Sequence, residues 1–206
     1  IHEPMAGALG IGLDVELPEG NMIIDIGGGT TDVAVIALSG IVTDQSIRVA
    51  GDDFTMDIVE YVKRQHNILI GERTAEQVKI HVGSALQDLE NPPEDFAVHG
   101  RDLLTGIPKQ VTVAYSEIAG CLDKSISKIE EAIMKALEST PPEWASDIYR
   151  KGIYLTGGGA LLRGLDKRIA MKTKLPVKVA DDPLRAVVRG TGIALKNRHR
   201  YTFLMS

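Results

Sequence analysis

The chain has 206 residues, of which 44% are hydrophobic and 25% are charged, as in an ordinary folded globular protein. The formal net charge is -5 and no basic stripe is present, which argues against a nucleic-acid-binding protein. No apolar run is long enough to span a bilayer, and the chain does not open with a signal peptide. The single cysteine, Cys121, excludes an internal disulfide and fits a reducing cytosol.

The first ten residues predict a helix that packs closely against a neighbour. Pro4 suits the first turn of a helix, and Ala6, Ala8 and Gly10 provide the small side chains that close packing needs. Because Ile1 is not a natural first residue, we expect an N-terminal half of the protein to lie outside this chain.

Three short β-rich runs follow, at residues 22–26, 33–38 and 41–49. Their connections are too short for crossover helices, so the three strands are predicted to be antiparallel.

The segment 52–115 is predicted to be a smaller α+β module inserted into a larger α/β unit. Thr74 and Gln77 have the spacing of a capping box, with Thr74 as N-cap. The predicted elements of this module are a helix capped by Asp52 or Asp53, a helix from Thr74 to about Ser84, and strands at 96–99 and 110–115.

The remaining residues predict alternating helices and strands. Apolar positions recurring every three or four residues predict a long helix over 116–138. After it we expect a short helix from the Pro141-Pro142 pair through Trp144, a strand at 153–156, a helix at 161–172, a strand at 177–179, and a final helix with Asp182 as N-cap and Pro183 as its first residue. Residues 1–51 and 116–206 would thus form the larger unit.

The strongest chemical signal follows the strand at 22–26. It consists of Asp25, Ile26, Gly27, Gly28, Gly29, Thr30, Thr31 and Asp32. Glycines let backbone N–H groups approach phosphate oxygens, and Asp25 at the strand end is placed to hold Mg²⁺ through water. A glycine-rich hairpin without a ligand is the alternative, but the preceding aspartate and the paired threonines favour phosphate binding.

A second triple glycine, Gly157 to Gly159, follows the strand at 153–156 and precedes Ala160. We expect it to lead into a helix whose N-terminus favours an anion. One such turn is weak evidence, but two at the carboxyl ends of apolar strands can face a single ligand. The sequence has neither a Walker-type Gly-Lys-Ser/Thr nor a Gly-x-Gly-x-x-Gly motif, which disfavours P-loop and dinucleotide-binding folds.

Three other charged residues have both a structural and a functional interpretation. Glu3 precedes Pro4, and by itself its position favours simple helix capping. Glu76 and Lys79 lie three residues apart, and by spacing alone a solvent-exposed ion pair is favoured.

Several motifs in order resemble the actin, sugar kinase and heat-shock chaperone ATPase superfamily, and within it the MreB family of bacterial actin-like cell-shape proteins. The superfamily motifs are Glu3 to Ala8, the two glycine turns, and Val188 to Gly192. Those similar to MreB proteins are Asp25 to Val35, Gly71 to Lys79, Thr140 to Glu143, and Leu155 to Arg163. The resemblance covers essentially the whole chain.

This resemblance implies a ribonuclease H-like actin-type ATPase domain, with residues 1–51 and 116–206 as subdomain IIA and residues 52–115 as an inserted subdomain IIB. It also implies ATP and Mg²⁺ as ligands. Glu3, assisted by Thr30, would orient the attacking water, while Asp25 would serve the metal. The other implied nucleotide-binding residues are Gly27, Gly28 and Gly29 at the β- and γ-phosphates, Glu76 and Lys79 at the adenosine, and Gly157, Gly158, Gly159 and Ala160 behind the adenosine and α-phosphate. Thr31 is also implied to bind the nucleotide.

The implied function is ATP-dependent self-association into filaments that govern rod shape and cell-wall synthesis. Partners would include cell-wall elongation and membrane-anchored morphogenesis proteins, in the cytoplasm beneath the inner membrane. Membrane contact would come mainly from the missing half, and the basic and apolar tail at 198–205 is expected to pack or fray rather than bind a membrane. A sugar or acyl kinase and a chaperone-type ATPase are the alternatives.

One departure from the superfamily pattern concerns catalysis. The first phosphate loop, an Asp-x-Gly-Thr-type turn near the N-terminus, has no counterpart here. Because hydrolysis relies on groups placed from both sides of the nucleotide, we expect this chain alone to bind ATP weakly and to hydrolyse it negligibly.

Overall fold

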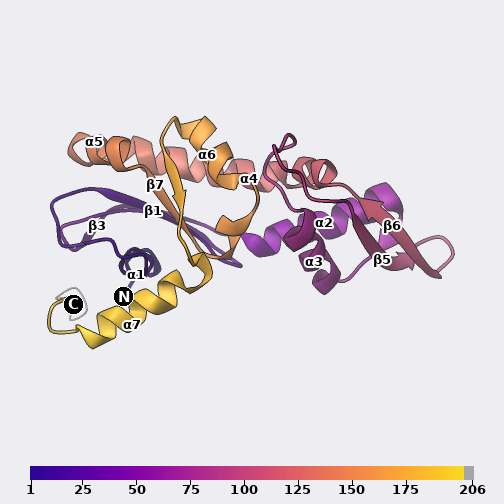
Figure 1. Cartoon of the computed structure of the whole chain (residues 1–206), viewed down its shortest axis with the longest axis horizontal. Helices are drawn as coiled ribbons and strands as arrows, with labels where there is room; N and C mark the ends of the chain where they lie inside the picture. Colours follow the sequence, from indigo (N-terminus) through magenta and orange to yellow (C-terminus); the bar gives the residue numbers. More distant parts are fainter. Residues whose placement is uncertain (202–206) are drawn as a thin grey trace.

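The computed structural model describes residues 1–201, which form two β-sheets with helices on their faces (Figure 1). The larger sheet has the strand order β3-β2-β1-β7-β8. Its strands are β1 (Asn21–Ile26), β2 (Thr31–Ala37), β3 (Gly40–Ile47), β7 (Ile153–Thr156) and β8 (Val177–Val179). β1, β2 and β3 pair antiparallel, as predicted, whereas β7 and β8 run parallel to β1.

The smaller sheet is antiparallel and comprises β4 (Ile68–Leu69), β5 (Phe96–Asp102) and β6 (Pro108–Val113). Seven α-helices lie within residues 1–201: α1 (Glu3–Gly10), α2 (Gly51–His66), α3 (Glu72–Val82), α4 (Tyr115–Glu138), α5 (Pro142–Lys151), α6 (Leu165–Thr173) and α7 (Ala186–Lys196). Two 3-10 helices, η1 (Gly158–Leu161) and η2 (Pro183–Arg185), complete the elements. The predicted α/β class is confirmed.

Both faces of the larger sheet are covered, which explains the continuous apolar run of β1. Successive side chains of a strand point to opposite faces. Ile24 therefore joins a large cluster beneath α4 and α6, whereas Ile23 joins a smaller cluster beneath α1 and α7. Figure 1 shows these two groups of helices on opposite sides of the sheet.

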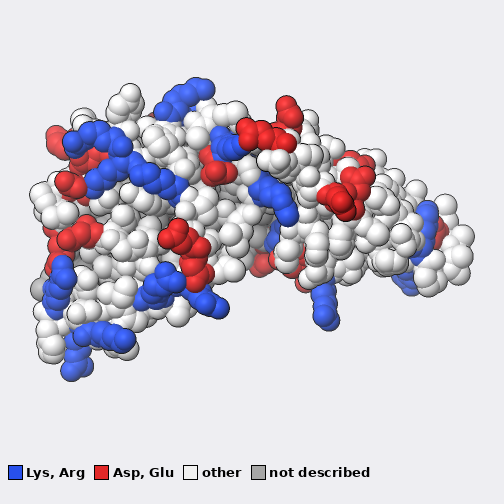
Figure 2. All heavy atoms as spheres, in the orientation of Figure 1, with Lys and Arg blue, Asp and Glu red and all other residues white. Residues whose placement is uncertain are grey.

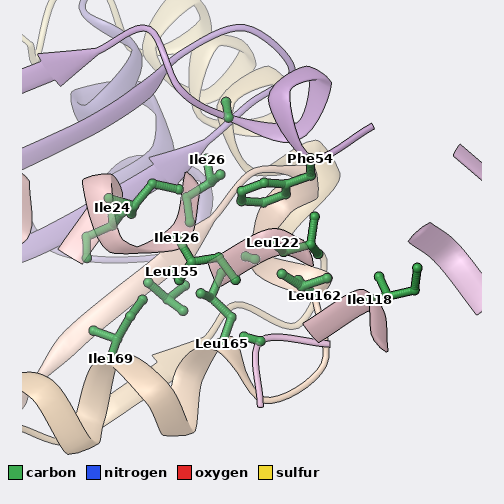
Figure 3. Close-up of a cluster of buried hydrophobic side chains, with 14 of the residues drawn as sticks. Ile24, Ile26, Phe54, Ile118, Leu122, Ile126, Leu155, Leu162, Leu165 and Ile169 are labelled. Carbon is green, nitrogen blue, oxygen red and sulfur yellow. The ribbon is translucent and has the colours of Figure 1, made fainter. Parts of the chain in front are cut away.

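The larger hydrophobic cluster continues from the main sheet into the smaller one. In Figure 3, Ile26 of β1 lies near Phe54 of α2, with Leu122 and Ile126 of α4 in the same cluster. The same cluster includes Val98 of β5 and further residues of the second sheet. Residues 52–115 thus share a buried core with the rest of the chain.

Two predicted helix starts are wrong. α3 begins at Glu72 after Gly71, and the Thr74 N–H donates to the Gly71 carbonyl within the first turn, so Thr74 is not the N-cap. A capping side chain contributes about 1 kcal/mol, and the earlier start adds backbone hydrogen bonds from Thr74 and Ala75 to the Gly71 carbonyl. At α2, Ala50 is the N-cap, and the Asp53 carboxylate accepts its N–H at 2.9 Å from inside the first turn.

Other boundaries also differ from the predictions. The helix after Pro141 continues to Lys151, because Ile148 is buried and extends its apolar face. Asp182 precedes the 3-10 helix η2 rather than α7 itself. β4 was not predicted, since two residues carry too little periodic signal, and residues 202–205 of the predicted tail lie outside the described residues.

The first and last helices cross at two glycines. A Cβ on Gly190 would lie 1.7 Å from the Ala6 carbonyl oxygen, and one on Gly10 would lie 1.8 Å from the Ala186 carbonyl oxygen. The small residues predicted to allow close packing at α1 therefore meet a glycine of α7, and no side chain fits between the two backbones.

Gly190→Ala is expected to lower the free energy of unfolding by at least roughly 2 kcal/mol, because the added methyl group forces the helices apart. Gly192→Ala is the matched control on the same helix, since its Cβ would meet nothing within 4 Å. That control is expected to be neutral or to stabilise by up to about 1 kcal/mol. Urea denaturation measures both, and equal stabilities would contradict the role of the crossing.

Candidate nucleotide-binding site

The two glycine turns lie side by side because the strands that precede them are parallel neighbours. In the register of β1 and β7, Asp25 stands opposite Thr156. Both turns therefore leave the sheet at the same edge, the carboxyl ends of parallel strands, where ligands of α/β sheets typically bind. The sequence prediction that the two turns can face one ligand fits this arrangement.

Asp25 is a buried carboxylate between the turns, with 6% of its surface exposed. Burial raises the pKa of Asp25; a hydrogen bond from the Thr156 hydroxyl at 2.9 Å opposes this shift, and the nearby carboxylates of Glu3 and Asp32 add to it. A desolvated anion in this state is stabilised by a cation placed beside it. Asp25 thus carries a desolvation cost that its single hydrogen-bond donor among the described residues, Thr156, only partly offsets.

Helix α2 holds the first glycine turn from behind. The Gly27 N–H closes the turn on the Thr30 carbonyl at 2.9 Å. The N–H groups of Gly51 and Asp52 donate to the carbonyls of Gly27 and Gly28 at 3.1 and 2.8 Å. These bonds use the carbonyl groups of Gly27 and Gly28 and tie the turn to the start of α2.

The second glycine turn is packed against the end of β1. Gly157 has φ +81°, and a Cβ there would lie 2.3 Å from the Ile26 carbonyl oxygen. A Cβ on Gly159 would lie 2.2 Å from Ile26 Cγ2, whereas one on Gly29 of the first turn would meet nothing within 4 Å. Gly157 and Gly159 are therefore required by packing, whether or not a ligand binds.

The last two glycines of this turn are already part of η1, and α6 begins only at Leu165. The expectation that the turn enters an α-helix is wrong, because Gly164 adopts a left-handed conformation that separates η1 from α6. The helix-dipole argument for anion binding does not apply here. Ala160 is buried, and its N–H donates to the Gly157 carbonyl at 3.3 Å.

Glu76 and Lys79 form part of a hydrogen-bonded network rather than an isolated surface pair. Lys79 Nζ lies 2.6 Å from Glu76 Oε2, and the lysine side chain is only 16% exposed. The same ammonium group donates to the Gly51 carbonyl at 2.8 Å. Burial alone would raise the pKa of Glu76, but hydrogen bonds from Lys79 and Thr55 outweigh it and lower the pKa.

These features enclose one cavity of about 800 Å³, within the size range of small-molecule sites. Of the predicted site residues, it is lined by Glu3, Asp25, Gly27, Gly28, Glu76, Lys79, Gly157, Gly158 and Gly159. Gly29, Thr30, Thr31 and Ala160 are outside the lining, and the Thr31 hydroxyl donates to the Val49 carbonyl at 2.7 Å.

Sequence reasoning missed much of the cavity wall. The missed lining residues are Gly51, Asp52, Phe54, Ile80, Leu161, Leu162, Pro183, Leu184 and Val187. The sequence shows that Asp52 is a carboxylate near the start of a helix, but it predicted only a capping role for this residue. The apolar residues come from four separate segments, and no local pattern in the sequence marks them.

The residues present suit a hydrated magnesium ion better than a protein-enclosed metal. Within residues 1–201, no group of three or more His, Cys, Asp or Glu side chains is arranged to hold a metal ion. Mg²⁺ typically keeps several waters and binds one or two carboxylates together with substrate phosphates. Asp25 beside a glycine turn fits that pattern.

The surface has no extended patch of one charge on the face shown in Figure 2, where acidic and basic side chains are interspersed. None of the helices described in residues 1–201 combines the length and apolar character that crossing a membrane requires.

Comparison with known proteins identifies the family. A model of the MreB/Mbl protein family matches residues 1–202. The chain belongs to the MreB/Mbl family. It is 47% identical over 196 residues to the cell shape-determining protein Mbl of Bacillus subtilis, and 49% identical over 196 residues to MreB of Escherichia coli. Both alignments cover 95% of this chain but only 58% and 56% of the relatives, so the chain spans little more than half of their length.

Solved structures of the MreB/Mbl family share the fold. The crystal structure of MreB5 of Spiroplasma citri bound to ADP has a TM-score of 0.92 and 44% identity, over 96% of this chain and 60% of that one. The form bound to AMPPNP has a TM-score of 0.93 and 42% identity, over 100% of this chain and 61% of that one. A MamK double helical filament has the same fold at 23% identity, with a TM-score of 0.76. The predicted actin-like fold is confirmed.

Asp25→Asn is expected to stabilise the nucleotide-free protein at neutral pH. When folding raises the pKa of a carboxyl group, the protein loses stability as the pH rises from the ordinary pKa of that group, 3.8 for Asp25, through its higher pKa in the folded state. The variant keeps the acceptor for Thr156 but has no charge to desolvate, so its advantage over the wild type should vanish below about pH 4.

Denaturation midpoints across the pH range, without nucleotide or divalent cation, measure this difference. Asp44→Asn, at an exposed carboxylate of β3, is the control and is expected to change stability by less than about 0.5 kcal/mol. An Asp25→Asn protein less stable than wild type at pH 7 would contradict the burial argument.

Proposed function

We propose that this chain forms one wall of the ATP site of an MreB/Mbl protein, and that the full-length protein uses ATP to govern filament assembly and cell shape. The observation that carries the proposal is the convergence of both glycine turns, Asp25 and the Glu76–Lys79 pair on one cavity. The family relationship supports it, since the similar MreB5 chain is described in complexes with ADP and AMPPNP.

The proposed roles follow from position in the cavity. In the turn Gly27 to Gly29, the N–H groups of Gly28 and Gly29 would bind the β- and γ-phosphates, because glycine lets the main chain approach them closely. The Gly27 N–H is donated to the Thr30 carbonyl and would hold the shape of the turn. Asp25 would bind a water-shielded Mg²⁺, which supplies charge neutralisation at the phosphates. Glu3 lines the same cavity and would orient the attacking water, assisted by Thr30.

The wall formed by α2 and α3 would contact the adenosine through Glu76 and Lys79. Gly157 to Gly159 would support the adenosine and the α-phosphate from the opposite side. We further propose that residues 52–115 form the inserted subdomain, IIB-like, and that the remaining residues form the ribonuclease H-like subdomain IIA.

The proposed setting is the cytoplasm beneath the inner membrane. Self-association into filaments would be the main interaction, with cell-wall elongation and membrane-anchored morphogenesis proteins as further partners. Membrane contact would come mainly from the part of the relatives that this chain does not match. The family match favours this function over a sugar or acyl kinase or a chaperone-type ATPase.

Sedimentation of the full-length protein that contains this sequence tests the proposal. Pelleting is expected with Mg-ATP and to be reduced with Mg-ADP or without nucleotide. Asp25→Asn should lower the affinity for nucleotide in the presence of Mg²⁺ by at least about tenfold, since one charged contact contributes roughly 1.5–3 kcal/mol. A protein that stays soluble in all three conditions well above micromolar concentration would favour the kinase function instead.

The 206-residue chain by itself is expected to release no phosphate from Mg-ATP above the buffer rate, because hydrolysis requires groups on both sides of the nucleotide and exclusion of water. A phosphate-release assay on the purified chain measures this. Turnover that is detectable and is lost in Glu3→Ala would show that one wall suffices and would overturn the expectation.

A further inference from the structure

A buried stretch of backbone after α3 belongs to no helix and to no strand of either sheet. It comprises Gly83, Ser84 and Ala85, and we refer to residues 83–86 as the strap. Buried N–H and C=O groups need hydrogen-bond partners, so such a stretch must find them elsewhere in the chain. Here the partners come from Arg163 and Arg168, which follow the second glycine turn.

Arg163 binds the strap through both its backbone and its side chain. The Ala85 N–H donates to the Arg163 carbonyl at 2.8 Å, beside an isolated parallel bridge between Ser84 and Arg163. The guanidinium group donates to the Ile80 carbonyl at 3.0 Å and to the Gly83 carbonyl at 3.5 Å. Carbonyls at the end of a helix lack partners within it and carry the negative end of its dipole, so a cation placed there stabilises the end of α3.

Arg168 of α6 binds the next carbonyl of the strap. Its side chain is only 14% exposed, and Nη1 donates to the Ala85 carbonyl at 3.2 Å. The same guanidinium group pairs with two carboxylates of α4, those of Glu130 and Asp123, each at 2.9 Å. These carboxylates hold the guanidinium in place, so the strap is tied to the contact between α4 and α6.

Two glycines allow the strap to approach this closely. A Cβ on Gly83 would lie 3.0 Å from Leu162 Cδ1 and 2.2 Å from the Lys79 carbonyl oxygen. Gly164 has φ +73°, and a Cβ there would lie 3.0 Å from Leu86 Cδ1. The contact therefore has no room for a further side chain.

The bonds of the strap join two segments that carry the apolar wall of the cavity. Ile80 of α3 lines the cavity, as do Leu161 and Leu162 after the second glycine turn. The strap begins three residues after Ile80, and Arg163 directly follows Leu162. Opening of the strap would separate these two parts of the wall. A ligand that contacts both parts would favour the closed strap, because it binds the closed arrangement better.

The strap is also an attachment of the inserted module, residues 52–115. The chain joins this module to the larger unit covalently at its two ends, and the strap adds a non-covalent attachment between those ends. A body held at two points can turn about the line that joins them. The third attachment resists that rotation.

We propose that the strap, held by Arg163 and Arg168, opens and closes between the inserted module and the larger unit, and that a nucleotide in the cavity favours its closed state. The inference rests on the proposed nucleotide site and concerns how occupancy of that site reaches the module. The coupling is reciprocal, so a closed strap favours nucleotide binding to the same extent.

The test replaces Arg168 with lysine in the full-length protein that contains this sequence. Lysine keeps a positive charge beside buried Glu130, but its single ammonium group cannot reproduce the planar fork that also reaches Ala85. Hydrogen exchange, followed by mass spectrometry on peptides that cover the strap, measures its opening. Exchange should be roughly tenfold faster in Arg168→Lys than in the wild type, since one charge-assisted hydrogen bond is lost.

Arg200→Lys is the matched control. Arg200 pairs with Glu16, its side chain is 57% exposed, and its replacement should leave exchange of the strap unchanged. Peptides from α5 report opening of the larger unit in the same samples, and they should exchange no faster in Arg168→Lys. Equal acceleration of α5 and the strap would show that Arg168 supports only global stability, and this would overturn the inference.

Mg-ADP at about ten times its Kd supplies the second readout. It should slow exchange of the strap by roughly tenfold in the wild type and in Arg168→Lys, because opening is linked to loss of the nucleotide. A wild type that binds no nucleotide in calorimetry would overturn the proposed site and this inference together. A wild type that binds Mg-ADP while the strap exchanges as fast as without it would overturn this inference alone, as would unchanged exchange in Arg168→Lys.

Discussion

The parallel pairing of β1 with β7 is the constraint on which the rest of the site depends. β1 is hydrogen-bonded on one side to an antiparallel strand, β2, and on the other to a parallel one. The antiparallel side makes a tight hairpin that contains the first glycine turn. The parallel side brings the second glycine turn to the same edge, with Thr156 bonded to Asp25. Any slip in this register would separate the two turns and remove the partner of Asp25.

A second constraint ties this edge to the smaller sheet. The Gly51 N–H donates a hydrogen bond to the Gly27 carbonyl of the first glycine turn, and the Gly51 carbonyl accepts one from Lys79 Nζ. α4, with 24 residues and a length of roughly 36 Å, packs against α2 and against strands of the main sheet. Because the hydrophobic cluster is also continuous between the sheets, the two walls of the cavity are joined by both backbone bonds and packing. A displacement of one wall would therefore be felt at the other.

The site contains elements that reduce stability. Asp25 is buried beside two other carboxylates, and desolvation disfavours its charged form. In a protein selected for stability alone, an amide or an apolar side chain would be expected at this position. Functional sites are where such local conflicts persist, because a bound cation or ligand restores the balance. The glycines at 157 and 159 are different, since packing against Ile26 alone requires them.

The sequence by itself determined the features that depend on local pattern. The long helix α4, the apolar strand β1 and both glycine turns were predictable, because periodicity and glycine runs act within a few residues, and the order of the motifs was enough to indicate the family. Tertiary structure showed what the capping pattern did not, that α3 begins at Glu72, where Thr74 and Ala75 donate their N–H groups to the Gly71 carbonyl. It also placed Thr55 against Glu76 and joined Asp25 to Thr156, 131 residues away in the chain. Such contacts depend on sheet order and helix packing, and no short segment of sequence encodes which distant partner a side chain will meet.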